Sequence, residues 1–372
     1  MSARYLAVVS TLFIAAAGCG EDDTGGAGGG VVVTGGSGGT GTGSGVGGTG
    51  TGGTGTGGTG TGTAGTGGGA GSSEGFACQY PGDVSIDSHG SVVWYEGFEQ
   101  GSVGAVVARY ESTSNEQRMA LEADVPAHSP GSASLRMTAG GGTNDTDLYK
   151  NFVTGWDELY LRYYVKYQDG VDWHHTGVHV GGYFPDSNWP QGGAGVRPNG
   201  DDRFSVAFEP VQNGTNPRFD FYNYWMGMQD SPGGSYWGNT LIHDTRVYAT
   251  HDWQCVELHI RMNTDTGSNA GAELGIWLDD VSYVQYDDQG PVGRWLHDKF
   301  CRDTPNTSPS CTDYFPLDPP DVVLDLQWRT TTDLKINYFW PQNYITAANT
   351  GDVWFDDIVI ATERVGCICP PS

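Results

Sequence analysis

Apolar and polar residues alternate along many short stretches of this chain, and this alternation predicts β-strands. In RFSVAFE, Phe204, Val206 and Phe208 alternate with polar or small residues, and in FDFYNY, Phe219 and Phe221 do the same. Successive side chains of a strand point to opposite faces, so each stretch has one apolar face and one polar face. The pattern predicts strands over residues 92–95, 134–137, 159–167, 177–181, 204–209, 218–224, 255–262, 274–278, 335–339 and 353–361.

Turns rich in Gly, Pro, Asn and Asp separate these strands, whereas amphipathic helices are not evident. We therefore predict an all-β fold for residues 76–372, an antiparallel two-sheet β-sandwich of the jelly-roll type. In VWFDDIVIA, residues 353–361, apolar residues lie on both sides of the Asp pair, which is typical of a strand near the centre of a sandwich.

The polar rows of several strands predict a ligand-binding face on one of the sheets. In VDWHHTGVHVGGYF, His175 and His179 point the same way across Gly177, while His174 points away. Aromatic rings offer flat apolar faces to sugars, and Arg and His supply hydrogen bonds, so we expect a carbohydrate groove. Its predicted lining is Arg162, Tyr164, Lys166, His175, His179, Arg203, Glu209, Asp220, Tyr222 and Tyr224, with Trp173, Trp189, Trp225 and Trp237 in or beside the loops.

The N-terminus predicts export. An apolar run from Tyr5 to Ala17 is too short to span a bilayer and ends at AAGC, which resembles the lipobox of bacterial lipoproteins. We expect residues 1–19 to be a signal peptide with Cys19 as the lipidated residue, so that the protein is extracytoplasmic, membrane-anchored or secreted. Residues 20–75, nearly all Gly and Thr, are expected to form a disordered linker.

Charge narrows the class of partner. The chain has 18 Lys and Arg against 44 Asp and Glu, a net charge of −26, which argues against nucleic acid as a partner. A polyanionic substrate remains compatible, because charges are screened beyond a Debye length and a groove can be locally basic. We expect a monomer that meets a membrane only through its lipid anchor.

Apart from Cys19, six of the seven cysteines remain, an even number that suggests disulfides in an exported chain. Cys301 and Cys311 bracket a short Pro- and Ser-rich loop and are expected to close it. Cys367 and Cys369 would point the same way on a strand, so each is expected to reach a distant partner. The favoured pairs are Cys255 with Cys367 and Cys78 with Cys369.

The segments WYEGFEQG, LYLRYYVKY and VWFDDIVIATERVGC resemble the first, middle and closing strands of concanavalin A-like jelly rolls, particularly bacterial polysaccharide lyases. The resemblance covers residues 91–367. It implies that a concave sheet holds a sugar chain, and it allows a structural calcium ion away from the active site. Lyases of this fold cut uronic-acid polymers by β-elimination, which requires neutralising a carboxylate and placing a base on the adjacent proton.

In alginate lyases of this fold, a Gln-Ile-His strand and a later Tyr-rich strand supply these roles. The matching segments here are GVH, residues 177–179, and FYNYW, residues 221–225. The resemblance implies His179 as base or neutraliser, Tyr222 or Tyr224 as base and acid, and Arg203 or Arg162 as carboxylate partner. Gly177 stands where the glutamine would be, and His175 is a candidate substitute.

Two alternatives stay open at the level of sequence. A glycoside hydrolase of the same fold needs two nearby carboxyls, for which Glu209 and Asp220 are candidates. A lectin-like module needs only the groove. The segment YFWPQNYITAANTGD, residues 338–352, is expected to be a loop that either walls one end of the groove or packs on the sandwich.

Overall fold

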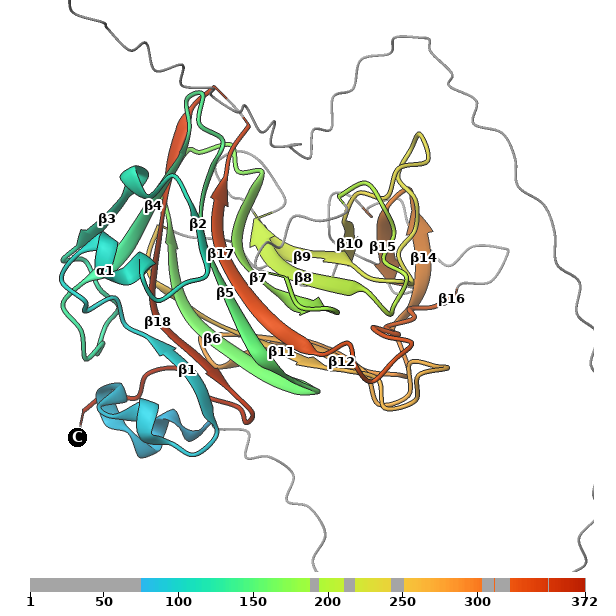
Figure 1. The fold of residues 1–372 in the computed structure, drawn as a ribbon, viewed down its shortest axis with the longest axis horizontal. Helices are drawn as coiled ribbons and strands as arrows, with labels where there is room; N and C mark the ends of the chain where they lie inside the picture. The colour runs from blue at the N-terminus through green and yellow to red at the C-terminus, as the bar shows by residue number, and fades with distance from the viewer. Residues whose placement is uncertain are drawn as a thin grey trace, which may run out of the picture. The chain divides into compact units, whose positions relative to one another are not determined.

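The computed structural model describes residues 75–187, 194–210, 218–241, 251–302, 311, 322–346 and 348–371. Within these ranges the chain forms two large β-sheets, one of eight strands and one of ten, called sheet A and sheet B here (Figure 1). Helical structure is limited to the short helix α1 (Val103–Val107) and to turns of 3-10 helix. The β-sandwich jelly roll predicted from the sequence is confirmed.

Sheet A has the strand order β13-β12-β11-β6-β18-β4-β3, and β1 pairs with the second half of β18. Its strands are β1 (Val92–Glu96), β3 (Met119–Glu122), β4 (Ser134–Gly140), β6 (Glu158–Tyr167), β11 (Gln254–Arg261), β12 (Glu273–Leu278), β13 (Val281–Tyr286) and β18 (Thr350–Ala361). The strand β18 has neighbours on both sides, as its apolar sequence predicts.

Sheet B has the strand order β16-β14-β15-β10-β9-β8-β7-β17-β5-β2. Its strands are β2 (Ser112–Ser114), β5 (Asp145–Trp156), β7 (His175–Tyr183), β8 (Arg203–Pro210), β9 (Phe219–Tyr224), β10 (Asn239–Leu241), β14 (Val292–Leu296), β15 (Lys299–Arg302), β16 (Val322–Val323) and β17 (Ile336–Tyr344). Its pairs are antiparallel except that β10 and β15 are parallel.

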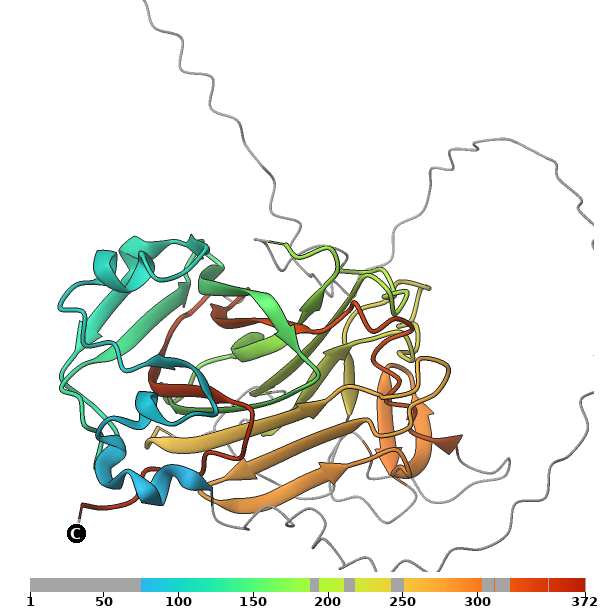
Figure 2. The ribbon, with the colours of Figure 1, turned by 60° about the horizontal axis from the view of Figure 1, so that its bottom comes forward.

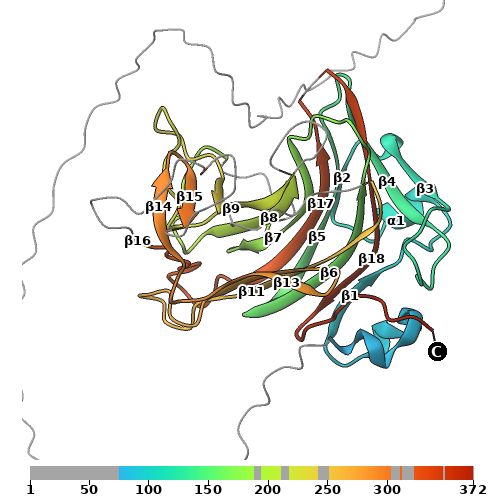
Figure 3. The same cartoon turned by 180° about the vertical axis from the view of Figure 1, so that it is seen from behind.

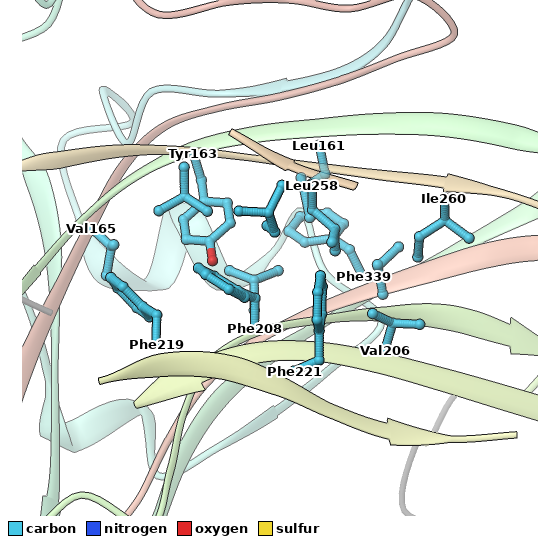
Figure 4. Packing of buried hydrophobic residues seen from close by; sticks show 14 of the residues in the cluster. Leu161, Tyr163, Val165, Val206, Phe208, Phe219, Phe221, Leu258, Ile260 and Phe339 are labelled. Carbon is cyan, nitrogen blue, oxygen red and sulfur yellow. The ribbon is translucent and has the colours of Figure 1, made fainter. Parts of the chain in front are cut away.

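The main core lies between the two sheets. Leu161, Tyr163 and Val165 of β6 face the rings of Phe208 and Phe221 from sheet B, as Figure 4 shows. Burial of these side chains stabilises the fold by roughly 1.5–3 kcal/mol for each large apolar residue. Since alternate residues of a strand face opposite ways, this core fixes which side chains of sheet B point away from sheet A.

Sheet B is curved, and its hollow side turns away from sheet A (Figures 1 and 3). We call this side the hollow face. It receives the alternate residues of β5, β17, β7, β8 and β9 that do not enter the core.

The two ends of the described chain lie together on the outer face of sheet A (Figure 2). Phe76 donates its backbone N–H to Arg364 O at 3.1 Å, and Ala77 donates to Val365 O at 2.8 Å. The predicted disulfides are all present: Cys78–Cys369, Cys255–Cys367 and Cys301–Cys311. Two of them join the C-terminal segment to residues far away in the sequence, which restricts the unfolded chain.

Most predicted strands are confirmed, with ends shifted by a few residues. The sequence did not predict β2, β3, β5, β10, β13, β14, β15 or β16, several of which are short. The expected loop after Phe339 is wrong, because β17 continues to Tyr344. The predicted signal peptide, Cys19 and the linker lie outside the described residues. No helix in the described ranges has the length and apolarity needed to cross a membrane.

Candidate functional site

Five side chains from four neighbouring strands meet on the hollow face. His175 and His179 come from β7, Glu209 from β8, Tyr222 from β9 and Gln342 from β17. The register places them near one another, because Trp340 of β17 pairs with His179, which pairs with Ala207, which pairs with Tyr222. We call these five side chains the central cluster.

His179 points to the hollow face because its neighbours Val178 and Val180 are in the core. Its Nε2 lies 2.8 Å from the side-chain nitrogen of Gln342, and its ring centroid lies 4.8 Å from that of Trp340. Only 6% of the residue is exposed. These contacts hold the imidazole in one orientation.

Gln342 is the member of the cluster that the sequence prediction missed. A proline at 341 is unusual inside a strand with two neighbours, because it cannot donate a ladder hydrogen bond, and it made a loop the natural prediction. The signal that was present is the period-two row Tyr338, Trp340, Gln342 and Tyr344, which continues past the proline onto the hollow face.

Glu209 lies between the two histidines. Its Oε1 is 2.7 Å from Nδ1 of His175, and its Oε2 is 3.6 Å from Nε2 of His179. Burial by itself raises the pKa of this carboxyl, but the charge of His175, its hydrogen bond to Glu209 and the neighbouring His179 ring lower the pKa to about 2. Glu209 is therefore ionised at neutral pH.

Gly177 makes room for this arrangement. A Cβ at this position would lie 2.5 Å from the backbone oxygen of Phe208 and 3.4 Å from Cβ of Glu209. Glutamine at 177, as the resembling lyases would have it, does not fit here. The amide instead comes from Gln342, whose backbone pairs with Gly177 across β17 and β7.

Tyr222 contributes a phenol to the cluster. Its ring centroid lies 4.5 Å from that of His175, and its hydroxyl accepts the backbone N–H of Gly238 at 3.0 Å. The hydroxyl of Tyr224 lies 3.3 Å from the hydroxyl of Tyr222, one step further from His175. A Cβ on Gly238 would approach the Tyr222 ring to 2.4 Å, so a glycine is required for this contact.

Arg203 shares the hollow face but lies at the end of β8. It pairs with Tyr183, four residues from the position that pairs with His179, which is ~13 Å along a strand. Its guanidinium donates to Val196 O at 2.5 Å and lies 5.9 Å from the centroid of the Tyr224 ring. Arg203 thus shares the hollow face with His179 but lies well apart from it along the strand direction.

Three predicted groove residues belong to the other sheet. Arg162, Tyr164 and Lys166 lie on the outer face of sheet A, because the residues between them face the core. Arg162 forms an ion pair with Asp83, Tyr164 accepts the N–H of Ile368 at 2.9 Å, and Lys166 pairs with Asp124. The prediction that they share a face with His179 is wrong, since alternation within a strand does not tell which sheet the strand joins.

The structure also shows where several other predicted groove residues lie. Trp225 is a core residue whose Nε1–H is donated to Asp325 O at 2.8 Å, so its place in the groove is wrong. Trp173 is likewise buried in the core. Asp220 is on the hollow face opposite Glu209, but it is fully buried and its Oδ2 is 3.3 Å from Arg218 Nη2. Trp189 lies outside the described residues.

His174 does not turn away from His175. The strand begins only at His175, so alternation does not reach position 174. The His174 ring lies 4.1 Å from that of His175 and 5.4 Å from that of Tyr344. Burial, followed by the charge of His175, lowers the pKa of His174 to about 4, which keeps it neutral at pH 7.

In the described ranges, no three His, Cys, Asp or Glu side chains gather in a way that would hold a metal ion. Calcium, which the resemblance allows, stays a prediction. A depression of about 310 Å³ lies beside Trp94 and Arg109, and no residue of the central cluster lines it. We assign the site by the convergence of functional groups rather than by this depression.

The chain has distant similarity to several solved structures. No family model and no curated protein matches the chain. Similar solved structures include a marine alginate lyase from Aplysia kurodai, at 14% identity over 73% of this chain and 99% of that chain, with a TM-score of 0.48. Alginate lyase Aly36B has 14% identity over 75% and 96%, with a TM-score of 0.42, and a variant of it was solved with an alginate tetrasaccharide.

An endo-β-1,4-glucuronan lyase from the fungus Trichoderma reesei is similar at 13% identity over 73% of this chain and 96% of that chain, with a TM-score of 0.38. These structures are of the kind that the sequence resemblance names.

Proposed function

We propose that this protein binds a polysaccharide containing uronic acids on the hollow face and cleaves it by β-elimination. The observation that supports this most is the central cluster itself. An amide, two imidazoles and a phenol converge on one face of adjacent strands, with Gln342 touching His179 and Tyr222 touching His175.

β-Elimination needs three groups: one that neutralises the uronate carboxylate, one that removes the adjacent proton, and one that protonates the leaving oxygen. The proton next to the uronate carboxylate becomes acidic enough to remove only when that carboxylate is neutralised by hydrogen-bond donors. The Gln342 amide and the His179 imidazole, held together at 2.8 Å, suit this role. Either His175 or Tyr222 then removes the proton, and the Tyr222 hydroxyl donates a proton to the leaving oxygen.

Hydrolysis fits the geometry less well. Glu209 and Asp220 face each other on adjacent strands, whose spacing of about 5 Å matches the carboxyl separation of retaining glycosidases. Such a pair needs one protonated carboxyl near neutral pH. The pKa of Glu209 is lowered to about 2 by His175 and His179 against the effect of burial, and Asp220 is held by Arg218.

A second carboxyl on the hollow face, Asp147, has its pKa raised to about 7 by burial and by Asp145. It pairs with Gln342 on β17 and lies three strand spacings from Glu209, ~14 Å away. Inverting glycosidases have carboxyls about 6.5–9.5 Å apart. Asp147 and Glu209 are therefore too far apart to act as such a pair.

The direct test is the product formed from a panel of polymers: alginate, glucuronan, pectate, glycosaminoglycans and neutral glucans. Elimination produces an unsaturated sugar end that absorbs ultraviolet light, and hydrolysis produces only reducing ends. We expect His179→Ala and Tyr222→Phe to abolish the absorbance while the fold is kept. Tyr160→Phe, a matched tyrosine change on the outer face of sheet A, serves as the control with unchanged turnover.

The absorbance persisting in both His179→Ala and Tyr222→Phe would reject the assignment. Binding of a polymer by the wild-type protein with no new ends of either kind would favour a lectin-like module instead. The hollow face supplies rings and hydrogen-bonding groups to such a module as well.

We also propose that the protein is anchored outside the cytoplasm. A lipid anchor at Cys19 and a Gly/Thr linker would hold the domain outside the cytoplasm, and the three disulfides fit an oxidising compartment. Expression of the full chain in a bacterium fed a labelled fatty acid tests the anchor. Label in the wild type and none in Cys19→Ala supports it, and equal label in both contradicts it.

A further inference from the structure

Three groups of the central cluster are candidates for the base: His175, His179 and Tyr222. The contacts that surround them separate these candidates. Glu209, which contacts both histidines, is 1% exposed and takes no direct part in the elimination described above. Burying an unpaired carboxylate destabilises the folded state. The position of Glu209 between the two rings therefore indicates that it interacts with at least one of them.

His179 is poorly suited to accept a proton. The Gln342 amide nitrogen lies 2.8 Å from its Nε2, and an amide nitrogen can only donate. The lone pair of Nε2 is therefore engaged, and the proton of the ring lies on Nδ1. In this form His179 is a hydrogen-bond donor, which suits contact with a carboxylate.

His175 has the opposite arrangement. Its Nδ1 lies 2.7 Å from Oε1 of Glu209, and an ionised carboxylate can only accept. Nδ1 thus carries the proton, and Nε2 has a lone pair. No described residue forms a hydrogen bond with Nε2 of His175, and the ring lies against Tyr222 at 4.5 Å.

We propose that Glu209 is a positioning residue that fixes this tautomer of His175 and makes His175 the general base of the elimination. The inference rests on the function proposed above. Nε2 of His175 takes the proton next to the uronate carboxylate, and the electron pair of the broken C–H bond forms the new C=C bond. The C–O bond of the linkage breaks, and the leaving oxygen takes the proton of the Tyr222 hydroxyl.

The imidazolium formed on His175 lies beside the Glu209 carboxylate, which stabilises it more than the neutral ring. Release of this proton to water and return of a proton from water to Tyr222 restore the starting state. Gly177 is next to this pair, and a Cβ there would lie 3.4 Å from Cβ of Glu209, so a larger side chain at 177 would crowd the Glu209 side chain.

A second Glu–His pair in the same protein provides a matched control for substitution of Glu209. Glu158 and His259 form a second Glu–His pair at 2.9 Å, on the outer face of sheet A. Glu158→Gln therefore makes the same chemical change as Glu209→Gln at a pair remote from the central cluster. Both variants are to be made in the full chain, and kcat, KM and polymer affinity measured on the best substrate of the panel.

We expect Glu209→Gln to lower kcat at least ~100-fold, within the range that acid–base catalysis contributes, with KM and affinity nearly unchanged. Glu209→Asp should recover part of the loss, and Glu158→Gln should match the wild type. A kcat of Glu209→Gln close to that of an active wild type would overturn the role of Glu209 while leaving the elimination intact. A wild type that binds polymer without forming unsaturated ends would refute the elimination itself.

A second measurement decides the position of the proton without turnover. The Nδ1–H of His175, bonded to a carboxylate, should give a far-downfield proton resonance in the NMR spectrum of the wild type. It should disappear in His175→Gln and move upfield in Glu209→Gln, because a neutral amide is a weaker acceptor. Absence of a resonance that depends on both residues would overturn the proposal.

Discussion

The side-chain nitrogen of Gln342 lies 2.8 Å from Nε2 of His179, although 163 residues separate the two in the sequence. The contact exists because β17 and β7 are neighbours in the middle of sheet B. It joins an amide to the histidine that the sequence selected, and under the function proposed above both groups would meet the substrate carboxylate.

Gln342 gives the first prediction. Gln342→Ala removes one donor to the substrate carboxylate, and loss of a donor that acts in the transition state typically costs ~100–1,000-fold in kcat. Gln342→Glu should be worse than Gln342→Ala, because it adds a negative charge where one must be neutralised. Steady-state kinetics on an acidic polymer check both. Equal activity of Gln342→Glu and the wild type would contradict the role of the amide.

Gly177 gives the second prediction. In Gly177→Ala the new Cβ would meet the backbone oxygen of Phe208 at 2.5 Å, so a strand must shift. Overpacking of this kind costs about 1–3 kcal/mol of the free energy of unfolding, and the shift should also disturb Glu209 and lower turnover. Urea denaturation and kinetics measure the two effects. Gly104→Ala, in α1 with open space around the new Cβ, is the control and should not lose stability.

The third prediction concerns pH. Burial and Asp145 raise the folded-state pKa of Asp147 to about 7, well above the usual aspartate pKa of about 4. A raised pKa means that the folded state loses stability as pH rises from about 4 to 7, by about 4 kcal/mol in all. Asp147→Asn stays neutral, so it should unfold at higher urea than the wild type at pH 8 and at similar urea at pH 4. The same gap at both pH values would refute this.

Arg162 gives the fourth prediction and tests the corrected placement. Its ion pair with Asp83 is fully buried between sheet A and the N-terminal segment. Removing one partner of a buried pair leaves an uncompensated charge and costs about 3–5 kcal/mol. Asp83→Ala should lower the free energy of unfolding by that amount, while kcat measured below the unfolding temperature stays near the wild-type value. A loss of substrate affinity without a loss of stability would instead indicate that Arg162 lies on the substrate-binding face.

The local pattern of the sequence determined the class of fold and the faces of individual strands. Period-two alternation is a property of neighbouring residues, so it correctly placed His175 and His179 together and Phe204, Val206 and Phe208 in the core. The cysteine pairing was also predictable, because few partners are suitable for Cys367 and Cys369.

Only the tertiary structure decided which strands are neighbours. Arg162, Tyr164 and Lys166 have the same alternation as the residues of β8, yet their strand joins sheet A. There Arg162 and Tyr164 contact the two ends of the described chain. Gln342 reaches His179, and Glu209 reaches His175, through pairing between distant segments. Such pairing depends on the packing of two whole sheets against each other, which no short stretch of sequence contains.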